Sequence, residues 1–211
     1  MMCRFLVALA ALLLLAGCGG SPAAQTSAPA PSGSSAPATS AATDSEQELQ
    51  TDRKQAGISD CPVSGDQPAR AGGLPDITMD CLGSHRRVRL PGLRGKPMVI
   101  NIWAQWCRPC RLEAPHLAAV AKQAGDSVDF IGIDYADPDP AAAIEFARKA
   151  GWRYPHLQDP DEQVKGPLKL IGVPQTFLVD AAGKIVYRQV RPLTSDGQLR
   201  TLIHDHLGVS V

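Results

Sequence analysis

The sequence carries no excess of charge of either sign and few aromatic residues. Its 211 residues include 21 Lys+Arg and 21 Asp+Glu, and aromatic side chains make up 5%. Affinity for nucleic acid requires clustered lysine and arginine that neutralise phosphates, and the chain has no long basic run. A nucleic-acid partner is therefore not expected. The length fits one globular domain with a tail better than it fits two domains.

The apolar run at the start of the chain is too short to cross a membrane. Phe5–Leu15 has 11 uncharged residues, whereas a transmembrane helix needs about 20. Because it follows Arg4, the run is typical of the apolar core of a secretory signal. The next residues, Leu15-Ala16-Gly17-Cys18, resemble the lipobox of bacterial lipoproteins, in which the cysteine is lipidated and becomes the first residue. We therefore predict a signal peptide over residues 1–17 and a lipid anchor on Cys18; the alternative is an ordinary signal peptide cut near Gly17.

The segment after Cys18 lacks the residues that build a core. Residues 19–43 have no charge, no aromatic residue and no large aliphatic side chain, so they bury too little apolar surface to offset the entropy of ordering. Residues 44–57 are polar and continue this segment, with at most a short frayed helix. The sequence thus predicts a disordered linker over residues 18–57 and a globular domain over residues 58–211.

Six cysteines in a chain bound for an oxidising compartment should pair or react. Cys3 leaves with the signal peptide and Cys18 receives lipid. The four that remain allow three pairings: Cys61, Cys81, Cys107 and Cys110. Because Cys107 and Cys110 share the motif Trp-Cys-Arg-Pro-Cys, the other two are left for each other. A structural Cys61–Cys81 bridge closes a loop of about 20 residues and stabilises the fold by roughly 3 kcal/mol; the alternative is a second, exchange-active pair.

Apolar patterning predicts an α/β domain in which parallel strand pairing comes first and antiparallel pairing later. A hairpin is expected over Leu74–Leu90. Further strands are expected at Met98–Trp103, Val128–Asp134, Thr176–Val179 and Lys184–Val190. Helices are expected at Arg108–Ala124, Pro140–Ala150 and Ser195–Leu207, with a short helical stretch at Asp161–Leu170.

The Cys-x-x-Cys motif lies where a buried strand ends and a helix begins. Three residues make nearly one helical turn, so the two sulfurs face each other. Cys107 lies at the positive end of the helix dipole, where a thiolate is stabilised, and Arg108 adds a positive charge. We therefore predict Cys107 as the nucleophile and Cys110 as the resolving thiol. A zinc site is the alternative, but it normally needs four ligands, and no second Cys-x-x-Cys or paired His is evident; no metal is expected.

The motifs together resemble a known family. Ile102-Trp103-Ala104-Gln105-Trp106-Cys107-Arg108-Pro109-Cys110, then Glu113 and Pro115, then Gly172-Val173-Pro174-Gln175-Thr176-Phe177-Leu178-Val179-Asp180, are similar to the thioredoxin fold in its TlpA/ResA-like extracytoplasmic branch. The likeness covers about residues 72–207. It implies a three-layer α/β sandwich, a mixed central sheet with an added N-terminal β-hairpin.

The resemblance also implies roles for residues around the cysteine pair. It gives Pro174 a cis peptide bond facing that pair, so that the Val173 backbone pairs with an extended client segment. Trp106 is expected to offer an apolar contact surface. Asn101 stands where thioredoxins have a buried Asp that exchanges protons with the deeper cysteine. Glu113 matches the Glu of the branch's Cys-x-x-Cys-x-x-Glu pattern and is the expected proton acceptor, unless it is a solvated charge paired with an arginine, Arg108 or Arg111.

These features predict a membrane-tethered thiol-disulfide oxidoreductase on the extracytoplasmic face of the bacterial cell membrane. No dissociable cofactor is expected, since the Cys107–Cys110 pair itself holds the two electrons. The expected partners are protein thiol or disulfide substrates and a membrane redox partner. The resemblance favours a reductant of client disulfides, with apocytochrome c a common client in this branch. The alternatives are a Dsb-like oxidant of secreted proteins, a Cu(I) chaperone, and a binding lipoprotein whose Cys107–Cys110 bond is merely structural.

Overall fold

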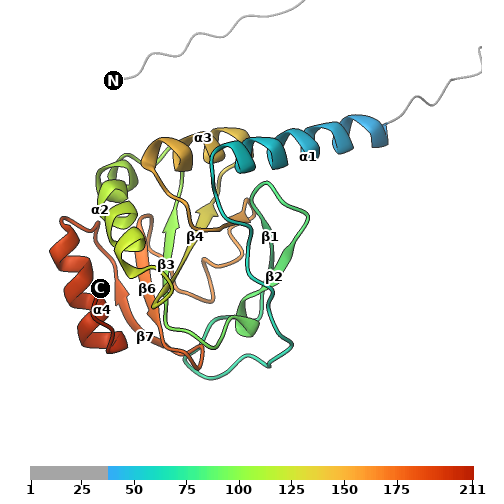
Figure 1. Ribbon diagram of the computed structural model, residues 1–211. Helices are drawn as coiled ribbons and strands as arrows, with labels where there is room; N and C mark the ends of the chain where they lie inside the picture. Colours follow the sequence, from blue (N-terminus) through green and yellow to red (C-terminus); the bar gives the residue numbers. More distant parts are fainter. Residues whose placement is uncertain (1–37) are drawn as a thin grey trace, which may run out of the picture. The chain divides into compact units, whose positions relative to one another are not determined.

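The computed structural model describes residues 38–211, which form one mixed sheet with helices (Figure 1). The elements in chain order are α1 (Ala38–Gln55), β1 (Thr78–Cys81), β2 (Arg87–Arg89), the 3₁₀ turn η1 (Leu90–Gly92), β3 (Met98–Trp103), α2 (Arg108–Ala124), β4 (Asp129–Tyr135), α3 (Pro140–Ala150), β5 (His156–Asp159), β6 (Gln175–Val179), β7 (Ile185–Gln189) and α4 (Asp196–Leu207).

Seven strands form the sheet in the order β2-β1-β5-β4-β3-β6-β7. Strands β3, β4 and β5 are parallel, whereas β6 and β7 and the β1–β2 pair run antiparallel to their neighbours. Every residue of β3 is buried, as an apolar strand with both faces covered requires. The predicted mixed α/β sheet is confirmed, but the order of pairing differs: the antiparallel β1–β2 pair comes first in the chain, before the parallel strands β3, β4 and β5 and the antiparallel strands β6 and β7.

The two faces of the sheet are covered differently. Buried residues of α2, α3 and α4 pack with one set of strand side chains, including Val99 and Trp103. The opposite set, including Ile100 and Ile102, packs with η1 and with the turn segment of residues 160–170. Helices α2 and α4 lie side by side (Figure 1). Helix α2, which begins next to the cysteine pair, therefore packs against both the sheet and α4.

The structure differs from the predicted elements at two places. The predicted helical stretch at 161–170 is a series of turns, because Pro167 has no backbone N–H to donate and the Asp159 carboxylate accepts from the N–H groups of Gln163 and Val164 instead. Strand β5 was not predicted at all; it is short, and a connection of five residues separates it from α3.

The domain begins earlier than residue 58. Helix α1 occupies much of the predicted linker. Arg53, near the C-terminal end of this helix, holds it against the domain. This buried side chain donates to the carbonyl oxygens of Gly83 at 2.9 Å and Ile58 at 2.8 Å. Gly83 has φ +65°, and a Cβ there would lie 2.7 Å from the Leu49 carbonyl oxygen. A polar segment is thus ordered by one buried arginine and a close backbone approach, neither of which its composition indicates.

Candidate functional site

The Cys107–Cys110 pair is a disulfide at the start of α2. Cys107 is the N-cap residue, and its sulfur accepts a hydrogen bond from the Cys110 N–H at 3.1 Å. Pro109 lies in the first turn, where its missing N–H costs nothing. Free N–H groups and the helix dipole at this end stabilise negative charge on the Cys107 sulfur once the bond is reduced.

Both sulfurs are well covered in this oxidised form. Cys107 is 3% exposed and Cys110 is fully buried. Cys107 is less exposed than expected of a nucleophile, because the carbonyl oxygen of Val173 lies 3.6 Å from its sulfur. The Val173–Pro174 peptide bond is cis. The predicted client-binding backbone therefore lies directly against the predicted nucleophile.

Trp106 stands out beside the cysteines, 52% exposed. Its indole N–H donates to the Ala136 carbonyl oxygen at 3.2 Å. One residue earlier, the Gln105 N–H donates to the Asp137 carboxylate at 3.1 Å. The loop after β4 thus fixes the approach to Cys107. Nothing in the local sequence pattern singles out Asp137, because its partner is about 30 residues away.

Glu113 is buried on the face of α2 that also carries Cys110, three residues earlier. It is 1% exposed. Its carboxylate accepts from the Asn101 side-chain amide and from the Leu193 backbone N–H, each at 2.9 Å. Burial raises the pKa of Glu113 to about 7, although both hydrogen bonds oppose the shift. A carboxyl with this pKa changes its protonation state near neutral pH, as a proton acceptor for a neighbouring thiol must.

The alternative for Glu113, a solvated ion pair with Arg108 or Arg111, does not describe this buried side chain. Arg111 donates to the Gln105 carbonyl oxygen, and its guanidinium lies over the Phe146 ring, 5.0 Å from the centroid. Asn101 also donates to the Thr176 hydroxyl at 3.1 Å. The amide that replaces the thioredoxin carboxylate therefore positions a carboxylate supplied by the helix.

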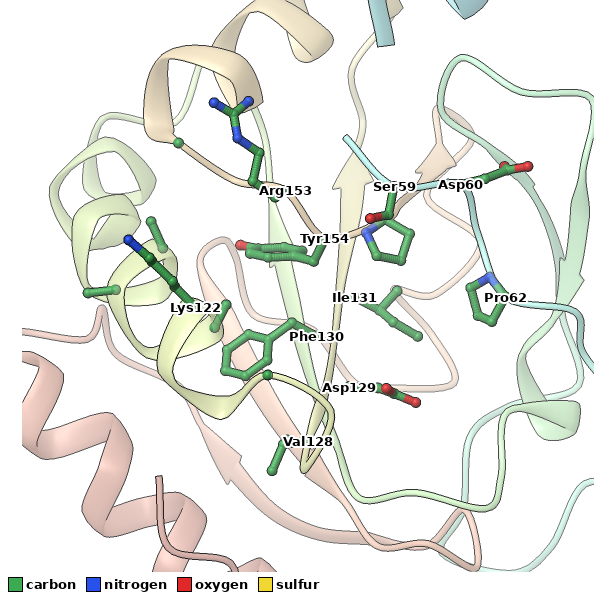
Figure 2. Close-up of a pocket in the computed structure, with 16 residues that line it drawn as sticks. Ser59, Asp60, Pro62, Lys122, Val128, Asp129, Phe130, Ile131, Arg153 and Tyr154 are labelled. Carbon is green, nitrogen blue, oxygen red and sulfur yellow. The ribbon is translucent and has the colours of Figure 1, made fainter. Parts of the chain in front are cut away.

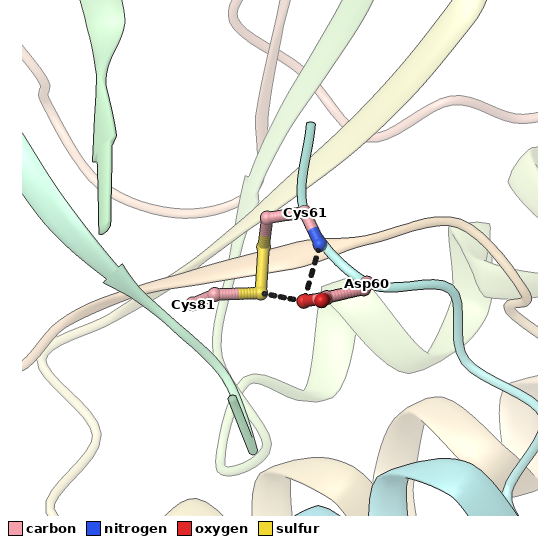
Figure 3. Close-up of side chains that lie close together, drawn as sticks. All are labelled: Asp60, Cys61 and Cys81. Atoms are coloured by element: carbon pink, nitrogen blue, oxygen red, sulfur yellow. Dashed lines mark hydrogen bonds between the residues drawn. A yellow bond between two sulfur atoms is a disulfide. The ribbon is translucent and has the colours of Figure 1, made fainter. Parts of the chain in front are cut away.

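A second disulfide joins Cys61 to Cys81 (Figure 3). Each of these cysteines is 1% exposed, which is what a structural bridge requires. The Asp60 carboxylate accepts from the Cys61 N–H at 2.9 Å and lies 3.6 Å from the Cys81 sulfur. Of the described residues, only Asp60 and these two cysteines come close enough together to form a group of metal-ligating type, and both sulfurs are used in the disulfide.

Replacing Asp60 by Asn is expected to make the Cys61–Cys81 bond easier to reduce. Reduction leaves a thiolate on one sulfur, which the neighbouring carboxylate opposes by about 1 kcal/mol in a water-like dielectric, or about fivefold in rate. Alkylation and mass spectrometry during exposure to dithiothreitol measure that rate. Asp80→Asn is the matched control, since Asp80 is the residue before Cys81 and pairs with Arg87 as Asp60 pairs with Arg86, whereas it is the Asp60 carboxylate that lies against the Cys81 sulfur. Equal rates in the three proteins would show that Asp60 does not protect the bond.

A pocket of about 790 Å³ lies away from the Cys107–Cys110 pair, and Ser59, Asp60 and Pro62, which flank Cys61, are among the residues that line it. Its walls come from the C-terminal half of α2, the start of β4 and the segment after α3, where Lys122, Phe130, Arg153 and Tyr154 line it (Figure 2). Two cations and two aspartates are among the lining residues. The charges of this pocket therefore do not select a ligand of one sign.

Three features together define a thiol-disulfide oxidoreductase of the thioredoxin fold. They are a Cys-x-x-Cys pair at the start of a helix, the backbone before a cis-proline against that pair, and a buried carboxyl one helical turn after the second cysteine. Residues 72–188 match the AhpC/TSA family model. The chain therefore belongs to the AhpC/TSA family, and the resemblance to its TlpA/ResA-like members is confirmed.

Individual relatives agree. The chain is similar to the thiol:disulfide interchange protein HelX of Rhodobacter capsulatus, with 36% identity over 58% of this chain and 68% of the relative. It is also similar to the thiol-disulfide oxidoreductase ResA of Bacillus subtilis, with 28% identity over 59% and 66%. The solved structure of a DsbF homologue from Corynebacterium diphtheriae superposes with a TM-score of 0.55 at 28% identity, over 69% of this chain and 87% of that one. The chain spans about two thirds of the two sequence relatives.

Proposed function

We propose that this oxidoreductase reduces disulfides of client proteins outside the cytoplasm. The observation that carries the proposal is the buried Glu113 carboxyl beside the cysteine pair. A reductant must deprotonate Cys110 at each turnover so that its sulfur attacks the mixed disulfide, and an acceptor with a pKa of about 7 serves this step at physiological pH. The cysteine pair carries the two electrons itself, so the reaction requires no dissociable cofactor.

The kind of client follows from the resemblance to the TlpA/ResA-like branch, which suggests apocytochrome c or a similar protein. The Val173 backbone against Cys107 supports recognition through main-chain hydrogen bonds, with Trp106 as an apolar contact. A membrane redox partner would return electrons to the Cys107–Cys110 pair after each turnover.

The amino-terminal motifs support a location at a membrane surface. We propose that residues 1–17 are a signal peptide and that Cys18 carries the lipid; both lie outside the described residues. In the part of the chain that the structure describes, no helix has the length and apolarity to span a bilayer. The linker then extends from Cys18 to α1, and the folded domain includes α1.

The second candidate is an oxidant that introduces disulfides into secreted proteins. It is favoured by the position of Cys107 at the helix N-terminus with the exposed Arg108 next to it. Both stabilise the thiolate and therefore the reduced form, which makes the disulfide more oxidising.

The resting redox state of Cys107 and Cys110 in cells separates the two directions. Cells that produce the full chain are quenched with acid, and their free thiols are alkylated before mass spectrometry. A reductant is expected to have these two cysteines mostly as thiols, while Cys61 and Cys81 stay bonded and serve as the internal control. If the pair is mostly a disulfide in growing cells, the oxidant is the correct assignment.

A further inference from the structure

The buried Glu113 carboxyl has no direct route to solvent. It is 1% exposed, and its two oxygens are occupied by the Asn101 amide and the Leu193 N–H. Glu113 can take the Cys110 proton only while its carboxyl is ionised, so a proton that it already holds must leave before the mixed disulfide is resolved. Some neighbouring group therefore has to carry the proton between Glu113 and water.

His116 lies one helical turn after Glu113 on α2. Its side chain is 29% exposed, so it is reached by water. Its Nδ1 lies 2.7 Å from Oδ1 of Asp196. Because an ionised carboxylate only accepts hydrogen bonds, Nδ1 carries the proton in this contact and Nε2 is left to exchange one. The ring can therefore accept a proton at one nitrogen while the other stays bonded to Asp196.

The short segment from Leu193 to Asp196 holds both Glu113 and His116. The N–H of Leu193 fixes Glu113, and Asp196, three residues later in the first turn of α4, fixes His116. The charge of His116 also lowers the pKa of Glu113, although burial dominates and leaves it raised, so the two side chains interact electrostatically. Tyr154 also interacts with Glu113, but burial raises the pKa of its hydroxyl, so it keeps its proton; on α4, Arg200 donates to Gln123 of α2.

We propose that His116, held by Asp196, carries protons between Glu113 and solvent and so sets the rate at which Cys110 is deprotonated. This inference rests on the proposed role of Glu113. The Cys110 thiol gives its proton to the Glu113 carboxylate. The Cys110 thiolate then attacks the Cys107 sulfur of the mixed disulfide, and the client sulfur leaves with the electron pair of the broken bond. Glu113 passes its proton to Nε2 of His116, and the imidazolium releases it to water.

The rate at which the mixed disulfide is resolved tests the relay. Reduced protein is mixed with an aromatic disulfide such as Ellman's reagent, and release of the second aromatic thiol is followed by stopped flow from pH 5 to 9. His116→Gln is expected to slow this step about tenfold near neutral pH and to flatten its pH profile, with partial rescue by added imidazole. His204→Gln is the matched control, an exposed histidine of α4 that also contacts an aspartate, Asp205. A His116→Gln profile that superimposes on the wild-type profile would overturn the relay.

Two further variants separate the relay from its premise. If Glu113→Gln slows resolution and the double variant with His116→Gln is no slower, the two groups act in one path. If Glu113→Gln alone is without effect, the role of Glu113 fails, and the relay fails with it. Asp196→Asn keeps the imidazole while removing its negative partner, which destabilises the imidazolium, so the profile should shift to lower pH. An unshifted Asp196→Asn profile would contradict the role of this pair even if His116→Gln unfolds the protein.

Discussion

In a Cys110→Ser variant, the protein is expected to stay covalently joined to its client through Cys107. The Cys107 thiolate still attacks a client disulfide, but a serine hydroxyl does not displace the client from the resulting mixed disulfide. An intramolecular thiol acts at an effective concentration of about 10⁵ M or more, so its loss should lower turnover by at least about 10³-fold. The joined species is visible as a band on a non-reducing gel with insulin as the disulfide substrate, and insulin precipitation measures the turnover.

The order of the two cysteines is checked with the opposite variant. Cys107→Ser should lose the activity equally but form no joined species, because Cys110 is fully buried behind Cys107. Accumulation of the adduct in Cys107→Ser, and not in Cys110→Ser, would reverse the assignment of nucleophile and resolving thiol.

Replacing Asp134 by Asn is expected to stabilise the protein strongly at neutral pH. Asp134 is 2% exposed at the end of β4, and within the described residues its Oδ1 has no hydrogen-bond partner. Burial, followed by the charge of Asp137, raises its pKa from 3.8 to about 9. Between these values the unfolded chain has lost a proton that the folded chain keeps, so stability falls as the pH rises. Asparagine fits the same place and has no proton to lose.

The size and sign of this effect depend on pH. Each pH unit above 3.8 costs about 1.4 kcal/mol, which gives an upper bound of about 4 kcal/mol at pH 7. Urea unfolding should therefore show Asp134→Asn more stable than wild type by about 2 to 4 kcal/mol at pH 7, with the difference vanishing below pH 4. The exposed Asp126→Asn is the control. A destabilised Asp134→Asn variant at pH 7 would show that the carboxyl has a favourable partner.

The elements around the cysteines could be predicted because their signals are local. Helix α2 has the predicted bounds, Arg108–Ala124, since the start is marked by Cys107 and the end by Gly125. Strand β3 could be predicted because it is a run of six residues that are all buried, whichever face of the sheet they point to. These two elements alone fix where the Cys-x-x-Cys motif lies.

Most of the missing parts of the prediction depend on partners distant in the chain. Asp137 and Leu193 hold the active-site loop and Glu113 from about 30 and 80 residues away, and no local spacing encodes such contacts. Helix α1 is ordered by contacts of Arg53 that its polar composition conceals. In the 161–170 segment, residues with helical propensity were outweighed by Pro167 and by the Asp159 carboxylate.

In this protein, Asn101 and Glu113 together replace the buried strand aspartate of thioredoxins. The distance from the acid to the thiol and the acidity of the acid are therefore determined by different parts of the fold. The spacing between acid and thiol is set by the rigid turn from Cys110 to Glu113, whereas the acidity of Glu113 depends on hydrogen bonds from β3 and from the loop before α4. Substitutions in that strand or loop could therefore retune the acid without moving it relative to sulfur. In this architecture, the working pH of the enzyme and the geometry of its chemistry can be engineered independently.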